Sequence, residues 1–345
     1  MPDPQRATIE PQGTTIDEEG ATVRQARTVL VVGGTAADPP AGLLPAPAGA
    51  RYTFARPPLR DADLSGADAI LLWQGRGRDV EAHWAAARRL RWIHAATAGV
   101  DGVLFPALVA SSVVLTNSRG VFDRAMAEYA LALMLHFAAD ISTTVVAQRE
   151  RRWEQHRYHP LAGRTAVVVG AGGIGRATAR LLRAVGLETR LVARTARPDP
   201  EFGQVEAIAD LAAILPGSAF VILVLPATSE SRGSFGAAQL GAMDQDAVLV
   251  NIGRGAVLDE AALVEALRAG RLGGAAIDVF TAEPLPPDDP LWRVPGLLVS
   301  PHMAGDFAGF EDALMTLFRA QLETWLADRP LQNVVDKQRG YVTTA

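Results

Sequence analysis

Residues 167–176 read VVVGAGGIGR, and this stretch decides the fold. The valines favour a buried strand, the glycines predict a tight turn, and residues 177–182 have the composition of a helix. Three of the glycines fit the G-x-G-x-x-G spacing: the first permits the turn, the second lets the backbone approach a pyrophosphate, and the third lets helix and strand pack closely. The start of the helix adds free N–H groups and a positive dipole end. We therefore predict a dinucleotide site whose turn residues are Gly170, Gly172, Gly173, Ile174 and Gly175.

The whole chain has the composition of a globular protein with two domains. Its 345 residues are too many for one compact core. The net charge of −5 gives no reason to expect nucleic acid as a partner. The absence of cysteine excludes disulfides, thiolate metal sites and a cysteine nucleophile, and it fits a reducing compartment. We predict no metal site.

The first 27 residues differ from the rest of the chain. They contain prolines and acidic residues but no apolar run, so we expect a disordered or loosely attached lead-in rather than a signal peptide. No stretch reaches the length of a membrane span. We therefore expect a cytoplasmic protein with no membrane partner.

Predicted strands alternate with predicted helices in two series. Strands of the first series are expected at 28–34, 69–73 and 113–115, and those of the second at 167–169, 188–193, 220–225, 247–252, 275–279 and 297–300. This alternation is typical of parallel sheets with helices on both faces. It predicts an α/β protein with two doubly wound parallel sheets.

Two helical patterns lie outside the strand series. Residues 123–146 form one long pattern that is apolar nearly all round, so we expect it to be buried between domains or against a second subunit. Residues 310–327 form an amphipathic helix near the end of the chain. The residues alone leave its place in the fold open.

Arg194 bears on which dinucleotide is bound. It stands about 20 residues beyond the glycine turn, where NAD-binding folds usually present an acidic residue to the ribose 2′-hydroxyl. A guanidinium there can hold a 2′-phosphate with two parallel hydrogen bonds, which favours NADP(H) over NAD(H). NAD remains possible, since Arg194 could instead stack on the adenine.

Three polar residues follow successive strands of the second series. Arg254, Glu283 and His302 come after the strands near 247–252, 275–279 and 297–300. Alone, each is readily explained as a surface cation, a loop carboxylate or a structural histidine. The carboxyl ends of parallel strands meet at the ligand-binding edge of an open sheet, so their joint placement predicts a catalytic site.

The loop at residues 98–102, AGVDG, follows an apolar pair at 92–93. Its position at the expected end of a strand allows two interpretations. It is either a substrate-contacting loop or a glycine turn capped by Asp101.

Residues 95–335 resemble the D-isomer-specific 2-hydroxyacid dehydrogenases. The resemblance rests on VLVNIGRGAVLDEAALVEALRAGRLGGAAIDVFTAEPLP, on LLVSPHMAG after it and on TNSRGVFDRAMAEYALALML before it. It implies that Arg254 binds the substrate carboxylate, that His302 is the acid/base and that Glu283 pairs with it. It further implies that backbone N–H groups of Ala98, Gly99 and Val100 bind substrate.

The resemblance also implies an arrangement of domains. A Rossmann-type nucleotide domain, residues 119–302, would be inserted into a flavodoxin-like substrate domain formed by residues 28–118 and 303–345. A homodimer would form through the long helix. The cofactor-binding residues expected besides the glycine turn are Arg194, Thr195, Arg197, Leu225, Pro226, Ile252, Gly253, Asp278 and Ala304.

The chemistry agrees with these roles. Reducing a 2-keto acid requires a cation to hold the carboxylate and a proton for the developing alkoxide. Arginine suits the first task, and histidine, which titrates near neutral pH, suits the second. We expect an NADP(H)-dependent reductase of a small 2-keto acid such as glyoxylate or hydroxypyruvate. The alternatives are an NAD(H)-dependent enzyme for a bulkier 2-keto acid and a non-catalytic, dinucleotide-sensing binding protein.

Overall fold

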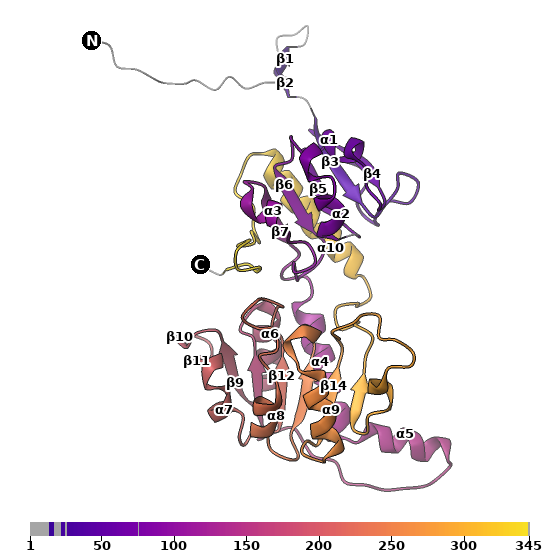
Figure 1. Ribbon diagram of the computed structural model, residues 1–345, viewed down its shortest axis with the longest axis vertical. Coiled ribbons are helices and arrows are strands. Elements are labelled where there is room, and N and C mark those ends of the chain that lie inside the picture. The colour runs from indigo at the N-terminus through magenta and orange to yellow at the C-terminus, as the bar shows by residue number, and fades with distance from the viewer. Residues whose placement is uncertain (1–13, 17–21, 25, 75, 344–345) are drawn as a thin grey trace, which may run out of the picture.

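The protein, a computed structural model in which residues 14–16, 22–24, 26–74 and 76–343 are described, is built on two parallel sheets (Figure 1). The strand order of the five-stranded sheet is β4-β3-β5-β6-β7. Its strands are β3 (Arg27–Val32), β4 (Ala50–Ala55), β5 (Ala69–Leu72), β6 (Trp92–Ala95) and β7 (Val114–Asn117). All its neighbouring strands are parallel.

The eight-stranded sheet has the order β10-β11-β9-β8-β12-β13-β14-β15. Its strands are β8 (Thr165–Val169), β9 (Glu188–Ala193), β10 (Arg197–Asp199), β11 (Gly203–Ala207), β12 (Phe220–Leu223), β13 (Val248–Asn251), β14 (Gly274–Ile277) and β15 (Leu297–Val299). Neighbours are parallel except for β10 and β11, which form an antiparallel edge. The predicted α/β class with two parallel sheets is confirmed.

Alternate residues of the central strands are buried on opposite faces of the eight-stranded sheet. Val167 and Val169 lie in one apolar cluster, whereas Ala166 and Val168 lie in the other. One face is covered by α7 (Leu211–Ile214), α8 (Ala237–Ala242) and α9 (Glu260–Arg268), and the other by α4 (Asp123–Ala138) and α6 (Gly173–Ala184). A sheet buried on both faces explains why its strands read as continuous apolar runs.

The five-stranded sheet is covered by helices from both ends of the chain. The short helices α1 (Asp61–Ser65), α2 (Gly77–Glu81) and α3 (Pro106–Ala110) carry residues of the cluster on one face. The other face packs on α10 (Phe310–Leu326), the yellow helix beside the indigo strands in Figure 1. The chain then runs along the edge of β7, where Val335 donates its N–H to the carbonyl of Leu115 at 2.8 Å. Lys337 donates to the carbonyls of Leu108, Ser111 and Val113.

The prediction of one continuous helix at residues 123–146 is wrong. It is broken into α4 and α5 (Ile141–Arg149), whose axes differ by 64°. Asp140 makes the break because it adopts the left-handed conformation, with φ of 46°, and its side chain accepts the N–H of Thr143. No single helix among the described residues is long and apolar enough to cross a membrane, and α4 and α5 pass that test only together, across their bend.

The predicted lead-in of residues 1–27 lies mostly outside the described residues. Within it, Thr14–Ile16 and Thr22–Arg24 pair as the antiparallel strands β1 and β2. The domain boundaries at 118/119 and 302/303 stay predictions.

Candidate active site

The glycine turn joins β8 to α6 as the sequence predicts. Gly170 has φ of 128°, and a Cβ atom on Gly175 would lie 1.7 Å from the carbonyl oxygen of Gly170. These two positions therefore require glycine. A Cβ atom on Gly172 would meet none of the described residues within 4 Å, so the backbone there faces open space. The turn therefore has the shape that a pyrophosphate requires.

A carboxylate from α4 lies against the first turn of α6. A Cβ atom on Gly173 would lie 2.4 Å from Oδ2 of Asp123. Burial raises the pKa of the Asp123 carboxyl, while the positive charges of Arg119 and Arg180 act in the opposite direction. The two helices thus pack closely only because the sequence places glycine at 173.

The predicted residues after β12 and β13 adjoin this turn. A Cβ atom on Gly170 would lie 2.6 Å from the carbonyl oxygen of Val224, and one on Gly253 would lie 2.8 Å from the nitrogen of Leu225. Pro226 follows Leu225 and is partly buried. The side chain of Ile252 is 1% exposed and belongs to the core, so only its backbone can face a ligand.

Arg194, which is predicted to hold a 2′-phosphate, lies after β9 with two further predicted cofactor residues. Arg194, Thr195 and Arg197 are all exposed, and Nη1 of Arg194 lies 3.7 Å from a carboxylate oxygen of Glu230. The edge strand β10 is fastened to α6, because Arg176 donates to both carboxylate oxygens of Asp199 at 2.6 and 3.2 Å. These hydrogen bonds hold the pKa of Asp199 well below its usual range.

Arg254 reaches from the end of β13 to the other half of the molecule. Its Nε donates to Oδ1 of Asp101 at 3.0 Å, and its Nη1 donates to the carbonyl of Gly253 at 2.8 Å. A Cβ atom on Gly99 would lie 1.7 Å from Nη2 of Arg254, so the guanidinium packs directly on this glycine. The structure therefore brings the predicted cation to the predicted substrate loop.

The loop at residues 97–102 is held by its carbonyl groups. The carbonyl of Ala98 accepts from the amide of Asn117 at 2.5 Å, and that of Gly99 accepts from Oγ1 of Thr97 at 2.6 Å. Among the described residues, no acceptor contacts the N–H groups of Ala98, Gly99 or Val100. These donors can therefore serve an anion.

His302 and Glu283 form a pair at the ends of β15 and β14. Nδ1 of His302 lies 2.7 Å from Oε2 of Glu283, and Oε1 of Glu283 accepts the N–H of Phe280 at 2.8 Å. His302 adopts a left-handed backbone with φ of 53°. The imidazole is about half exposed, with 49% of its side-chain surface accessible. Its Nε2 has no partner among the described residues, so it is open to substrate.

The loop of Arg254 touches the loop that carries Glu283. A Cβ atom on Gly255 would lie 2.0 Å from the carbonyl carbon of Phe280, the residue whose N–H binds Glu283. Since β13, β14 and β15 are adjacent and parallel, Arg254, Glu283 and His302 lie at one edge of the sheet.

The carboxylate of Asp278, a predicted cofactor-binding residue, holds the backbone that follows His302. Its side chain is 1% exposed and accepts from Ser300 at 2.5 Å and from the N–H groups of Met303 and Ala304, both at 2.9 Å. Ser300 also lies 2.6 Å from the hydroxyl of Tyr129 on α4. The side chain of Ala304 is likewise buried, at 4% exposure.

Sequence reasoning missed Asp101, Ser300 and Tyr129 as parts of this site. Asp101 was considered only as a turn cap, because its ion pair with Arg254 spans 153 positions. The strand-end position of Ser300, beside a predicted catalytic residue, was an available signal. Nothing in the sequence around Tyr129 indicates a place in this site.

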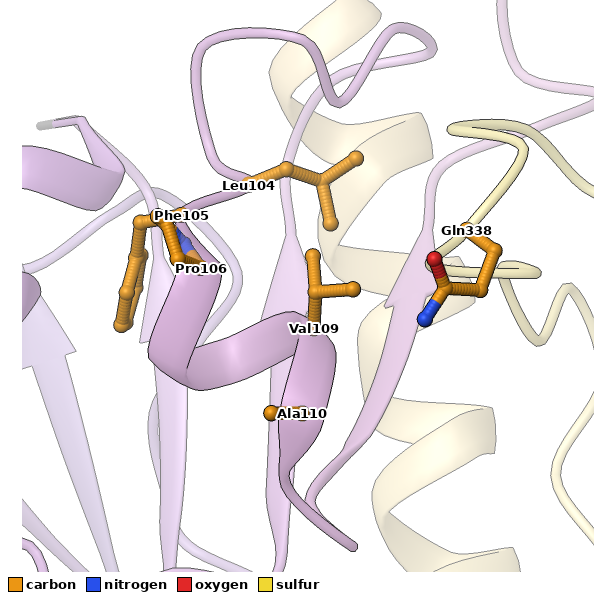
Figure 2. A pocket seen from close by; sticks show the side chains of 6 residues that line it. All are labelled: Leu104, Phe105, Pro106, Val109, Ala110 and Gln338. Carbon is orange, nitrogen blue, oxygen red and sulfur yellow. The ribbon is translucent and has the colours of Figure 1, made fainter.

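A separate hollow lies beside α3. Figure 2 shows Gln338 facing Val109 across it, and its remaining lining residues are Leu104, Phe105, Pro106 and Ala110. None of these side chains ionises near neutral pH, so the hollow contains no acid/base group.

Comparisons with known proteins identify the family. Residues 131–304 match the family model described as D-isomer specific 2-hydroxyacid dehydrogenase, NAD binding domain. The chain is 34% identical over 226 residues to glyoxylate reductase of Korarchaeum cryptofilum, covering 64% of this chain and 68% of that protein. It is 30% identical over 287 residues to glyoxylate/hydroxypyruvate reductase A of Salmonella heidelberg, covering 81% and 89%. A solved NADPH-dependent glyoxylate/hydroxypyruvate reductase of Sinorhizobium meliloti, in complex with NADP and sulfate, superposes with a TM-score of 0.79 at 28% identity, covering 92% of this chain and 100% of that one.

Proposed function

The chain belongs to the D-isomer specific 2-hydroxyacid dehydrogenase family, and we propose that it reduces a small 2-keto acid, glyoxylate or hydroxypyruvate, with NADPH. The family makes it an NAD(P)-dependent oxidoreductase. The observation that carries the proposal is the gathering of Arg254, Glu283 and His302 at the ends of three adjacent strands. The relatives named for glyoxylate and hydroxypyruvate support the substrate class.

NADP(H) fits the nucleotide site by its shape and charge. The pyrophosphate would lie on the backbone of Gly172, where a Cβ atom would meet nothing, at the N-terminus of α6. The 2′-phosphate would be held by Arg194, Thr195 and Arg197, which are exposed after β9, and it would replace the Glu230 carboxylate as the partner of Arg194. When bound, the nicotinamide supplies the hydride that the keto carbon accepts.

Arg254 and the loop at 98–100 bind and orient the substrate. In this proposal Nη2 of Arg254 and the N–H groups of Gly99 and Val100 hold the substrate carboxylate. Holding the carboxylate from two sides fixes the direction of the neighbouring carbonyl group, which is the positioning that the reaction requires.

His302 supplies the proton to the carbonyl oxygen. Glu283 accepts from Nδ1 of His302, which fixes the ring and leaves the proton for substrate on Nε2. Glu283 is itself fixed by the N–H of Phe280. In the reverse direction, the same Nε2 accepts the proton of the 2-hydroxyl group.

We also propose a homodimer formed through α4 and α5. Four apolar side chains of these helices are 38–46% exposed: Leu135, Ile141, Val145 and Val146. Trp153, in the connector that follows, is 94% exposed. A second copy of the chain would cover this surface. The cytoplasmic location expected from the sequence also stays a prediction.

The proposal is tested by kcat/KM for glyoxylate and hydroxypyruvate with NADPH and with NADH. We expect NADPH to be preferred by at least about tenfold, and Arg194→Glu to remove that preference, since a carboxylate repels the 2′-phosphate. Arg271→Ala is the control, because Arg271 is exposed at the opposite edge of the sheet, before β14. Equal turnover with NADH would contradict the NADP assignment. Tight NADPH binding with no reduction of any 2-keto acid would favour a sensor over an enzyme.

A further inference from the structure

The ion pair between Arg254 and Asp101 joins the two halves of the molecule. Arg254 follows β13 of the eight-stranded sheet, and Asp101 follows β6 of the five-stranded sheet. Their side chains are 28% and 32% exposed, so water reaches both. Ion pairs this accessible to water contribute little to folding stability. The pair of Arg254 and Asp101 is therefore better explained by the orientation it gives to the guanidinium.

The hydrogen bonds of Arg254 leave one side of its guanidinium available. Nε is taken by Asp101 and one donor of Nη1 by the carbonyl of Gly253. Nη2 meets no acceptor among the described residues and lies against Gly99. The available donors of the guanidinium therefore lie beside Gly99, whose N–H group has no acceptor among the described residues.

We propose that Asp101 is a positioning residue for the substrate carboxylate. It holds Arg254 so that Nη2 and the N–H groups of Gly99 and Val100 face one small space, in which a carboxylate receives donors from both halves of the protein. A free arginine side chain would have to lose its rotamer freedom when substrate binds, and Asp101 removes that cost in advance. This inference rests on the proposed function, since it assumes that the ligand of Arg254 is a 2-keto acid.

If Asp101 competed with substrate for Arg254, its removal would change substrate affinity in the opposite direction. If Asp101 merely occupied Arg254 until a substrate carboxylate displaced it, removing its charge would lower KM. If it positions Arg254, removing its oxygen raises KM, and restoring a neutral acceptor at the same place reverses most of the loss.

The experiment compares Asp101→Ala with Asp101→Asn. We expect Asp101→Ala to raise KM for hydroxypyruvate by about tenfold or more, with a smaller change in kcat, because a carboxylate loses an oriented charge-assisted hydrogen bond. Asn keeps an oxygen where Oδ1 stands, so KM should return to within about threefold of wild type. The dissociation constant of NADPH and the melting temperature should stay unchanged in both variants. Asp63→Ala is the matched control, since Asp63 is likewise an aspartate paired with an arginine in the same half, but its partner is Arg60.

A second variant perturbs the same pair from the glycine side. A Cβ atom on Gly99 would overlap Nη2 of Arg254 and lie 3.0 Å from Oδ1 of Asp101, so Gly99→Ala should raise KM as Asp101→Ala does, while the Asp101 side chain itself is kept. An unchanged or lowered KM in Asp101→Ala would overturn the inference, as would failure of Asn to restore it.

Binding of oxamate, an unreactive mimic of a 2-keto acid, separates this inference from the proposed reaction. Calorimetry on the NADPH complex measures it whether or not turnover occurs. Wild-type binding that weakens in Asp101→Ala and recovers in Asp101→Asn supports the positioning role even if glyoxylate and hydroxypyruvate are not reduced. Equal oxamate binding in all variants contradicts it even if they are.

Discussion

At the scale of single residues, two histidines show how burial decides the role of one side chain. His302 is half exposed beside Glu283, whereas His94 is fully buried between Thr116 and Ser118 and burial lowers its pKa to about 3. The unfolded chain binds a proton at His94 near pH 6.5, but the folded chain does not. Below pH 6.5 this group therefore favours unfolding. It lowers the free energy of unfolding by about 1.4 kcal/mol for each pH unit as the pH falls towards 4.

Urea unfolding at several pH values between 4 and 7 checks this prediction. His94→Asn should show a shallower fall in the free energy of unfolding with falling pH than wild type. The carboxylates titrate in both proteins, so their contribution cancels in the comparison. Parallel curves for the two proteins would contradict the assignment of this pH dependence to His94.

At the scale of elements, the turn between β8 and α6 is defined by close approach of backbone to backbone. We expect Gly175→Ala to disrupt the turn, because its Cβ would overlap the carbonyl oxygen of Gly170. The dissociation constant of NADPH should rise at least about tenfold, and the protein should lose about 1–3 kcal/mol of stability. Fluorescence titration and chemical unfolding measure the two effects.

Gly241→Ala in α8 is the control, because a Cβ atom there meets none of the described residues within 4 Å. This variant should gain up to ~1 kcal/mol in the free energy of unfolding without a change in NADPH affinity. Equal effects of the two substitutions would show that lost glycine freedom, not overlap, is responsible.

The elements also show what the sequence could predict. The buried strands of both sheets were foreseen because burial on two faces leaves a continuous apolar run, as in β8 and β12. The edge strands β4 and β10 were not predicted, because both are partly exposed and contain polar residues that also suit a loop. The break at Asp140 was hidden because apolar residues continue on both sides of it.

In the candidate site, too, local sequence patterns could be read and contacts between distant segments could not. Residues fixed by their own strand, such as Arg254, Glu283 and His302, could be placed at the sheet edge from spacing alone. Contacts between distant segments could not, and Asp101 with Arg254 is the main example, because only the packing of two sheets brings them together. Burial of the Asp278 carboxylate by Ser300 and the backbone of residues 303 and 304 was equally beyond a strand pattern.

At the scale of the whole molecule, the proposed homodimer rests on the exposed apolar surface of α4 and α5. We expect wild-type protein to sediment as a dimer and Val146→Glu to sediment as a monomer, because a carboxylate cannot be buried there without a partner. Val185→Glu is the matched control, since Val185 is 38% exposed at the end of α6, outside this surface. Analytical ultracentrifugation at several concentrations distinguishes these outcomes. A monomeric wild type, or a Val146→Glu dimer as stable as the wild type, would rule out this interface.

The return of the chain to β7 has a consequence for how the protein is made. The first sheet leaves the ribosome early, yet one face of it waits for α10, and its β7 edge waits for Val335 and Lys337. The second sheet is synthesised completely in the interval and has all its strands and covering helices before residue 310. The nascent chain can therefore complete its second half first, and its first half carries an uncovered apolar face that a chaperone can bind until α10 has been synthesised.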